Sequence, residues 1–376
     1  MPPSTRGEAV AATERQRWPR ALLLPACLAA VTLSAATLPE DRLEALYHSY
    51  DGGGVKVTGP ALFARKNIAW GLSASAEYYV DTISSASIDV VTSASPYDEE
   101  RTEYSVGFEW LYGDSVIGVG YTNSDEDDYT SDTYSLAVSQ EMFSGMSTVT
   151  MAYSHGDDVV ERVDTDFRDR VDRDTFGVGL TQVLTPTMLA TVNYQAVLEE
   201  GFLNNPYRSA RILGAQIPER YPRTRTGQAL GFELLKSWNR KTSIRGGYQY
   251  FTDTWEIQAN TAEIGASYYI DDEWLIDLSY RYYTQDAASF YSDNFDREYN
   301  YMARDKELSS FNSQAIGGRL TWNMQRDNLP LGVHRAKLTM GYDYLMFNYD
   351  DFTDIRTGDL YDFNSHVFQI YFSAFY

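Results

Sequence analysis

Hydrophobic and polar residues alternate with a period of two along most of the chain after about Leu43. In YSVGFEWLY, residues Tyr104–Tyr112, every second residue is large and apolar or aromatic, and the positions between them hold Ser, Gly, Glu and Leu. Successive side chains of a strand point to opposite faces, so this pattern predicts a strand between an apolar phase and a more polar one. The same division occurs in residues 72–78, 264–268, 274–282, 316–324 and 338–342.

The connections between the predicted strands have two lengths. Tight turns are predicted near Gly113-Asp114, Phe143-Ser144-Gly145, Thr185-Pro186-Thr187, Asn239-Arg240 and Asp271-Asp272. Long polar loops are predicted at 84–100, 122–131, 156–170, 200–223, 285–307 and 350–362. Short turns that alternate with long loops are typical of outer-membrane barrels. Counting a short first strand in EALYHSYD before GGG, we predict an all-β fold: a transmembrane, antiparallel, up-and-down β-barrel of about sixteen strands, within a range of about 14 to 18.

Charged residues of the predicted strands fall on the face opposite the aromatic one. A Lys or Arg that faces lipid at mid-bilayer costs about 2–4 kcal/mol, so this segregation favours a membrane barrel. A soluble β-sandwich is the alternative, but its outer face should be rich in Lys and Glu rather than Tyr and Trp. The lumen-facing candidates are Glu77, Glu109, Glu233, Arg245, Glu263, Asp277, Arg281, Arg319, Lys337 and Asp343. Their mixed signs predict either a weakly selective channel or an interior crossed by salt bridges.

The last residues, HVFQIYFSAFY, keep the alternation up to the C-terminus. A final strand must pair with the first to remove the open edges that hydrocarbon forbids. The pattern at Phe368, Ile370, Phe372 and Tyr376 also resembles the terminal signal that the outer-membrane assembly machinery recognises, with Tyr in place of the commoner final Phe. The expected partners are therefore this machinery, outer-membrane lipid and lipopolysaccharide, in the bacterial outer membrane.

The N-terminal segment is the one stretch that is apolar enough for a secretory signal. Arginines precede ALLLPACLAAVTLSAAT, residues 21–37, and small residues suit cleavage after Ala36. We predict a signal peptide at residues 1–36 and a single barrel domain at residues 37–376. The only cysteine, Cys27, lies in the signal, which excludes a disulfide framework in the mature chain. LLPAC also resembles a lipoprotein signal, and lipidation of Cys27 is the alternative.

Composition and charge limit the partners. The chain contains 30 Tyr, 17 Phe and 7 Trp, and Tyr and Trp prefer membrane interfaces. A net charge of -22 excludes nucleic acid as an expected partner, because phosphate binding needs clustered Lys and Arg. The acidic segments 123–132 and 349–359 offer oxygen ligands for divalent cations, with Asp125, Asp127 and Asp128 as metal candidates. The alternative is ordinary solvated charge, and no other cofactor is predicted.

Residues 201–227 form the one strongly basic loop. Its arginines Arg208, Arg211, Arg220 and Arg223 are candidates for a constriction loop that folds into the pore, and the alternative is that they neutralise acidic neighbours. No enzymatic motif is evident, so an enzyme is not expected. The closest arrangement is YSHGDD, where His155 oriented by Asp157 suggests a hydrolase at the barrel rim; the alternative is a polar strand end.

Three segments, residues 50–67, 78–107 and 120–135, resemble hallmark segments of a bacterial domain-of-unknown-function family of exported, outer-membrane-type proteins. The resemblance implies a barrel and no established activity, so it transfers no catalytic or binding residue. It also implies gene neighbours for a small lipoprotein and a flavin-attaching enzyme, and hence envelope protein partners. The leading hypothesis is a porin-like channel for small hydrophilic solutes; the alternatives are an occluded scaffold in an envelope redox or flavin-associated complex, and a rim hydrolase.

Overall fold

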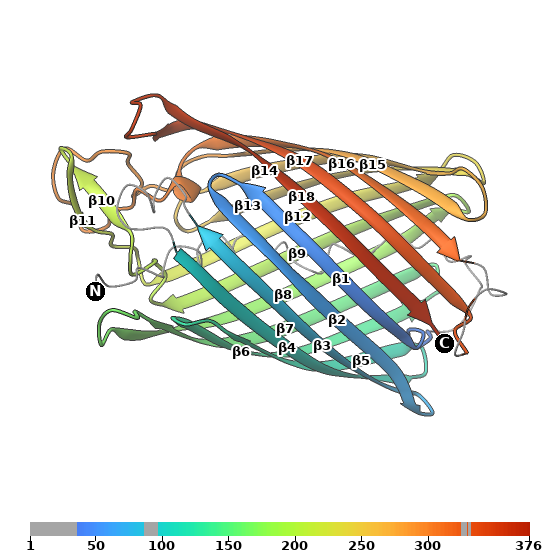
Figure 1. Cartoon of the computed structure of the whole chain (residues 1–376). Coiled ribbons are helices and arrows are strands. Elements are labelled where there is room, and N and C mark those ends of the chain that lie inside the picture. Colours follow the sequence, from blue (N-terminus) through green and yellow to red (C-terminus); the bar gives the residue numbers. More distant parts are fainter. Residues whose placement is uncertain (1–35, 86–96, 325–328, 330–331) are drawn as a thin grey trace.

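The computed structural model describes residues 36–85, 97–324, 329 and 332–376, and within them sixteen strands form one closed antiparallel barrel (Figure 1). The barrel strands are β1 (Arg42–Gly52), β2 (Val55–Ala69), β3 (Leu72–Ser85), β4 (Tyr97–Tyr112), β5 (Ser115–Asp125), β6 (Tyr129–Met142), β7 (Ser147–Glu161), β8 (Arg168–Thr185), β9 (Met188–Gly201), β12 (Thr224–Ser237), β13 (Thr242–Asp253), β14 (Gln258–Tyr269), β15 (Trp274–Gln285), β16 (Phe311–Met324), β17 (Arg335–Thr353) and β18 (Leu360–Phe375). A separate hairpin, β10 (Ser209–Ile212) and β11 (Ala215–Pro218), and a 3-10 turn, η2 (Lys306–Leu308), lie in the connections. The predicted fold class and strand number are confirmed.

Some of the predictions concern residues outside the described part of the chain. These are the signal peptide up to residue 35, including Cys27, and most of the predicted loop at 84–100. Among the described residues, no helix is both long and apolar enough to cross a membrane.

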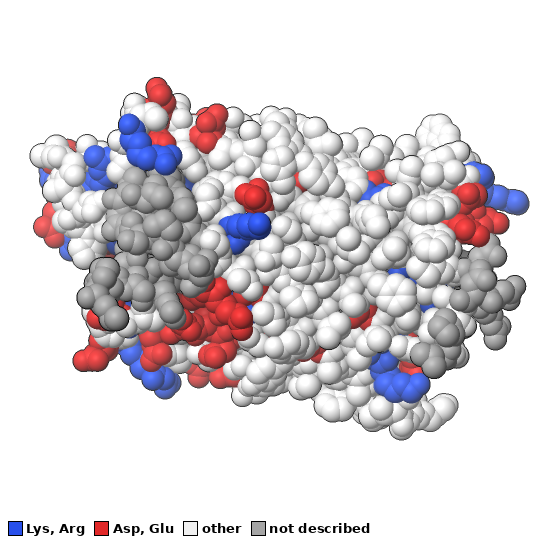
Figure 2. Space-filling view, in the orientation of Figure 1, with Lys and Arg blue, Asp and Glu red and all other residues white. Residues whose placement is uncertain are grey.

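The alternating pattern has the predicted effect on the barrel wall. On β4, Phe108 and Trp110 are 48% and 52% exposed, whereas Glu109 between them is only partly exposed. The exposed apolar side chains of the other strands follow the same period, because each residue of a strand faces away from the next. Figure 2 shows that charged residues on the displayed face gather at the two ends of the barrel, and that the wall between them is largely free of charge. This uncharged wall is the surface that lipid requires.

Strand β18 closes the barrel against β1. Their register runs from Arg42 opposite Phe375 to Gly52 opposite Ser365, and the backbone N–H of Tyr376 donates to the carbonyl oxygen of Asp41 at 3.2 Å. The predicted pairing of the last strand with the first is therefore confirmed. Closure leaves none of the sixteen described barrel strands with an open edge. The backbone N–H and C=O groups of each strand can therefore form hydrogen bonds to its neighbours, which is required where there is no water.

The barrel has a turn end and a loop end. The turn end holds all five predicted tight turns and the C-terminus, and Gly113 there has a φ of 58°, a conformation that suits glycine. The loop end holds β10, β11 and η2. Three of the predicted long loops are mostly strand: the true connections are residues 126–128, 162–167 and 354–359. The strands continue past the apolar pattern because each polar segment still finds backbone partners on its neighbours.

Aromatic residues on the outer face mark the two membrane interfaces. Toward the loop end, Tyr194 donates its hydroxyl to Gln228 at 3.1 Å and Tyr280 donates to Gln314 at 3.0 Å. At the turn end, Trp274 and Trp322 are paired across β15 and β16 with their ring centroids 6.0 Å apart. Such side chains favour the interface because the ring is apolar and the polar tip can form a hydrogen bond.

Candidate functional site

Ion pairs on the lumen face connect nearby strands of one wall, either adjacent strands or strands one apart. The Arg319 guanidinium lies 3.5 Å from Asp343, and the Arg245 guanidinium lies 3.4 Å from Glu263 and 3.8 Å from Asp277. Strand glycines make room for these contacts, since a Cβ on Gly265 would lie 2.5 Å from the Arg245 guanidinium. This wall, built from β12 to β17, therefore carries interleaved charges that largely balance each other.

The ten lumen candidates occupy equivalent positions on their strands. Each lies on the strand face opposite the exposed apolar residues, which is the position that a lumen-facing side chain requires. Glu109 pairs with Arg65 of β2, with 2.9 Å between nitrogen and oxygen. The Arg281 guanidinium lies 5.7 Å from the centre of the Tyr283 ring on the same strand. Glu77, Glu233 and Lys337 occupy the same face of β3, β12 and β17.

The opposite wall is uncharged over its central part. Along β5 to β8, the lumen face carries only Gly, Ala, Ser and Thr at alternate positions from Gly118 to Thr122, Thr133 to Ser139, Thr148 to Ser154 and Thr175 to Thr181. Small side chains leave more of the lumen open than long ones do, and hydroxyl groups can bond to water. The two walls therefore combine a charge-lined surface with a small, polar one.

Two loops pack together at the loop end and form what we call the outer cap, residues 202–223 and 286–310. Backbone bridges join Ile212 to Phe295 and Arg220 to Met302. Trp255, from the connection between β13 and β14, packs with Tyr221 and Phe290 of the cap in a small apolar core, with ring centroids 5.6 Å and 5.1 Å away. The cap is an ordered structure with its own core.

A buried polar cluster joins the two loops of the cap. Arg208 donates to Asp305 at 2.9 Å, and Glu219 accepts the backbone N–H of Arg304 at 2.6 Å and the hydroxyl of Tyr221 at 2.9 Å. Arg208, Glu219 and Asp305 are all buried. Burial, together with the negative charge of Asp305, raises the pKa of Glu219 to about 7.

Three of the four arginines predicted to line a constriction are paired with carboxylates. Arg208 pairs with Asp305, Arg220 with Glu298 at 2.7 Å, and Arg223 with Asp169 at 2.8 Å. Arg211 is half-buried and lies on β10. These contacts agree with the alternative interpretation, in which the basic loop neutralises acidic neighbours. The loop at 286–310, which was not a constriction candidate, lies beside the basic loop, as the bridges Ile212–Phe295 and Arg220–Met302 show.

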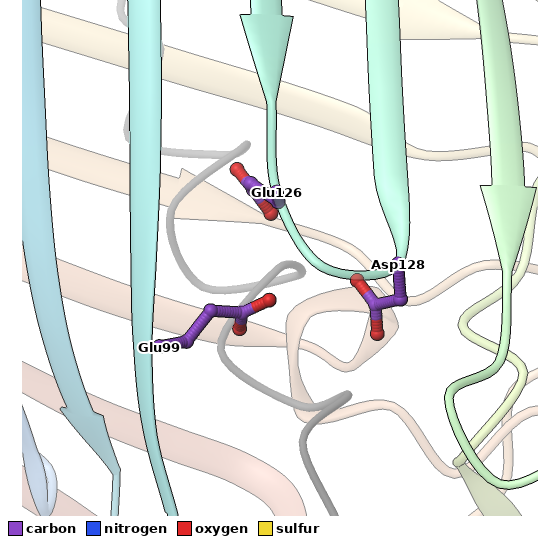
Figure 3. Close-up of side chains that lie close together, drawn as sticks. All are labelled: Glu99, Glu126 and Asp128. Atoms are coloured by element: carbon purple, nitrogen blue, oxygen red, sulfur yellow. The ribbon is translucent and has the colours of Figure 1, made fainter.

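Three acidic residues lie close together at the loop end of the barrel (Figure 3). Glu99 of β4 and Glu126 and Asp128 of the β5–β6 connection are buried, and one oxygen of each lies within 4.8 Å of the others. Carboxylate oxygens are ligands that Ca²⁺ and Mg²⁺ prefer. However, the guanidinium of Arg101 lies 3.8 Å from Glu126 and 3.1 Å from Glu103, so a positive charge is already present among the carboxylates.

Only one of the predicted metal candidates belongs to this group. Asp128 joins it, whereas Asp125 accepts the hydroxyl of Thr130 at 3.0 Å, and Asp127 is not a member. Glu99 was not predicted, and Glu126 was included only as part of the acidic segment 123–132. The available signal was the alternation of Glu99, Arg101 and Glu103 along β4, which places these charges on the lumen face.

The arrangement proposed for a rim hydrolase is not formed as predicted. The carboxylate beside His155 belongs to Asp174 of β8 and not to Asp157, with 3.0 Å between His155 Nδ1 and the Asp174 oxygen. The hydroxyl of Tyr153 also donates to Asp174, at 2.7 Å. His155 faces outward like its neighbour Tyr153, whereas Ser154 lies on the lumen face. Alternation along the strand therefore separates the serine from the histidine, and Asp174 takes the position that was assigned to Asp157.

One solved outer-membrane structure shares this fold, and two others resemble it to a smaller extent. A bacterial polysaccharide outer membrane secretin has a TM-score of 0.52 at 8% sequence identity, and the match covers 91% of this chain and 100% of that chain. OccK2 (OpdF) of Pseudomonas aeruginosa, in complex with glucuronate, has a TM-score of 0.46 at 5% identity and covers 89% of this chain and 98% of that chain. A loop L8 deletion mutant of OmpT, an outer membrane protein of Vibrio cholerae, has a TM-score of 0.45 at 7% identity. The match covers 90% of this chain and 98% of that chain. At 8% identity, the match to the secretin shows the fold alone.

The sequence comparisons identify the family. No curated protein matches the chain. The sequence model of a protein family of unknown function, DUF3570, matches residues 161–348, which is half of the chain. The three segments that carried the resemblance precede the matched residues. Together with the closed barrel and its uncharged outer belt, this match establishes that the chain is an outer-membrane β-barrel and belongs to the DUF3570 family.

Proposed function

We propose that the protein is a porin-like channel that passes small hydrophilic solutes by diffusion. The observation that carries the proposal is the polar inner face of a closed ring of sixteen described strands. Barrels of about sixteen strands enclose an aqueous channel, whereas eight-stranded barrels are filled by their own side chains. A lumen lined only for packing would not need charged residues on every strand from β12 to β17.

The composition of the lumen supports weak ion selectivity. Arg245 and Arg319 are paired with carboxylates on nearby strands, so the charged wall presents no ring of one sign. The hydroxyl-rich wall of β5 to β8 adds hydrogen-bonding groups without charge. Uncharged polar solutes and small ions of either sign are therefore the class that this lumen fits.

Single-channel recording in a planar bilayer tests the proposal. We expect stepwise conductance from the refolded protein, and we expect Asp343→Asn to shift the ion preference toward anions because it leaves the Arg319 charge unbalanced. Asp114→Asn, at an exposed turn outside the lumen, is the matched control and should leave the preference unchanged. A heat-resistant, folded barrel that never conducts would end the channel proposal.

The occluded scaffold remains the second candidate because of the outer cap. The cap has its own apolar core and a buried polar cluster at the loop end, as a plug would. If the folded protein is silent and stays silent after both cap loops are shortened, the scaffold becomes the better proposal. Envelope partners would then be sought with the whole barrel as bait.

A further inference from the structure

The outer cap is attached to the barrel rim on two opposite sides. Directly after β7, the Arg162 side chain donates to the carbonyl oxygen of Pro206 at 3.0 Å. At the end of β17, the carbonyl oxygen of Thr353 accepts from Arg304 at 2.7 Å. In the closed ring, β7 and β17 are eight places apart in either direction. The cap therefore extends from one side of the mouth to the other.

A buried ion pair joins the two halves of this connection. Arg208 follows Pro206 by two residues, Asp305 follows Arg304 directly, and Arg208 donates to Asp305 at 2.9 Å. We call residues 206–208 and 304–305 the mouth bridge. Arg208 and Asp305 are buried, so their attraction is weakly screened by solvent.

Further contacts hold the mouth bridge in place at each anchor. Near β7, the Arg162 guanidinium lies 4.8 Å from the centre of the Tyr207 ring, and the backbone N–H of Val163 donates to the Tyr207 hydroxyl at 3.0 Å. Near β17, the Arg304 guanidinium lies 4.4 Å from the centre of the Phe352 ring and 2.8 Å from Asp293. Both anchors have several contacts, and the centre is held by the Arg208–Asp305 pair and by the hydrogen bond from the backbone N–H of Arg304 to Glu219.

We propose that the mouth bridge sets the largest solute that the channel admits, with Arg208 as its central positioning residue. The proposal rests on the proposed channel function and adds a size limit to it. A strut across a ring divides one opening into two smaller ones, so a solute must pass beside the bridge. Without the Arg208–Asp305 pair, the two anchored segments lose the ion pair between them. The bridges Ile212–Phe295 and Arg220–Met302 still hold the cap loops together, so the opening becomes wider beside the bridge while the cap stays folded.

The barrel does not depend on the mouth bridge. β9 and β12, which flank the first cap loop, are paired directly over their length, as are β15 and β16 on either side of the second. A change in the bridge should therefore alter permeation without preventing the barrel from closing. This separates the proposal from a purely structural role for Arg208.

Liposome swelling with neutral sugars of increasing size, from a monosaccharide to a tetrasaccharide, tests the proposal on the full barrel. For Arg208→Ala, we expect the larger sugars to enter about twofold faster or more, because permeation depends on pore diameter. Arg220→Ala is the matched control: Arg220 lies in the same loop and pairs with Glu298 at 2.7 Å, but it is exposed and outside the bridge. It should leave the size limit unchanged.

A covalent link across the cap provides the rescue. Ile212 and Phe295 are bridged between the two loops, and the only natural cysteine is Cys27, so Ile212→Cys with Phe295→Cys introduces one new disulfide across the cap. In the Arg208→Ala background, oxidation should restore the narrow size limit and reduction should remove it. If Arg208→Ala fails to give a heat-resistant barrel, Asp305→Asn takes its place, since it removes the charge and keeps the size of the side chain.

The possible failures are distinguishable. If the wild type admits small sugars and a folded Arg208→Ala barrel has the same size limit, the mouth bridge proposal is wrong and the channel proposal stands. If neither protein admits any sugar or conducts any ion, both proposals fail together. If Arg220→Ala widens the pore as much as Arg208→Ala does, the size limit belongs to the cap as a whole and not to the bridge.

Discussion

The barrel wall and the outer cap are stabilised by different interactions. In the wall, every barrel strand is hydrogen-bonded to a neighbour on each side. Most charged side chains of β12 to β17 are only partly exposed on the lumen face, and Glu99, Arg101 and Glu103 of β4 are buried. In the cap, the two loops meet at isolated backbone bridges, and an aromatic core and buried charges supply the other contacts. The comparison shows that the cap can be loosened without opening the wall, so the wall's closure and the mouth's width are separable properties.

The strongest test of this separation is Trp255→Ala. Trp255 is 3% exposed, its ring lies 4.5 Å from the Arg225 guanidinium, and its indole N–H donates to the carbonyl oxygen of Thr224 at 3.0 Å. Truncating a buried Trp costs about 3–5 kcal/mol, so hydrogen exchange should show lost protection in the cap while the barrel strands stay protected. Trp238, 72% exposed at a turn, is the control for Ala substitution. Loss of protection throughout the barrel would contradict the separation.

A charge placed on the lipid face should destabilise the wall and spare the cap, the reverse of the effect of Trp255→Ala. Leu278 is an outward residue of β15 and is 60% exposed. Leu278→Arg should lower the free energy of unfolding from vesicles by about 2–4 kcal/mol and leave the cap's local protection intact. Ser279→Lys, the next residue and on the lumen face near Asp343, is the control and should have a much smaller effect. Equal losses from the two substitutions would mean that the faces are assigned wrongly.

The pH dependence of the cap should differ from that of the wall. The folded cap raises the pKa of Glu219 to about 7, so it keeps a proton that the unfolded loop releases near pH 4.5. The stability from this proton is fully present below the unfolded value and is lost as the pH rises through about 7. Proteolysis of the cap should therefore be faster at about pH 8 than at about pH 5, and Glu219→Gln should remove the difference. A cap that is equally resistant at both values would contradict this account.

The smallest effect is expected at an exposed arginine of the cap. Arg223 makes a bidentate contact with Asp169, with distances of 2.8 Å and 3.0 Å, but it lies in solvent. Exposed ion pairs contribute about 0.2–1 kcal/mol, so Arg223→Ala should change cap protection only slightly and less at high salt. A loss as large as that from Trp255→Ala would show that this contact stabilises the cap more than exposure suggests.

The wall was predictable because successive residues of a strand face opposite sides, so every second residue of a strand faces lipid and the others face the lumen. Residues 104–112 show this most clearly, since exposed apolar residues alternate with lumen-facing ones along the segment. The predicted turns lie where glycine or a polar pair interrupts the pattern. The ends of β7 and β8 were less predictable, because polar strand segments have no apolar signature once they leave the bilayer.

The cap was not predictable from local patterns. Arg208 and Asp305 are 97 residues apart, and nothing in either loop indicates the other as its partner. The excess of arginine in residues 201–227 indicated acidic neighbours correctly but could not name Asp305, Glu298 or Asp169. Glu99 was not predicted because it lies outside the acidic segment 123–132, and the pairing of β4 with β5 brings it beside Glu126.

The seam between β1 and β18 has a consequence for biosynthesis. Ser373 donates to Glu44 at 3.1 Å, which joins residues 329 positions apart. Contacts this distant in sequence are slow to form, because a long stretch of chain must be ordered before they are gained. The edge of β1 that pairs with β18 has no partner until the last residues have been synthesised, and exposed strand edges aggregate readily. The chain therefore depends on being kept apart from its copies during export, and a truncation of even the final strand should turn a membrane protein into an aggregating one.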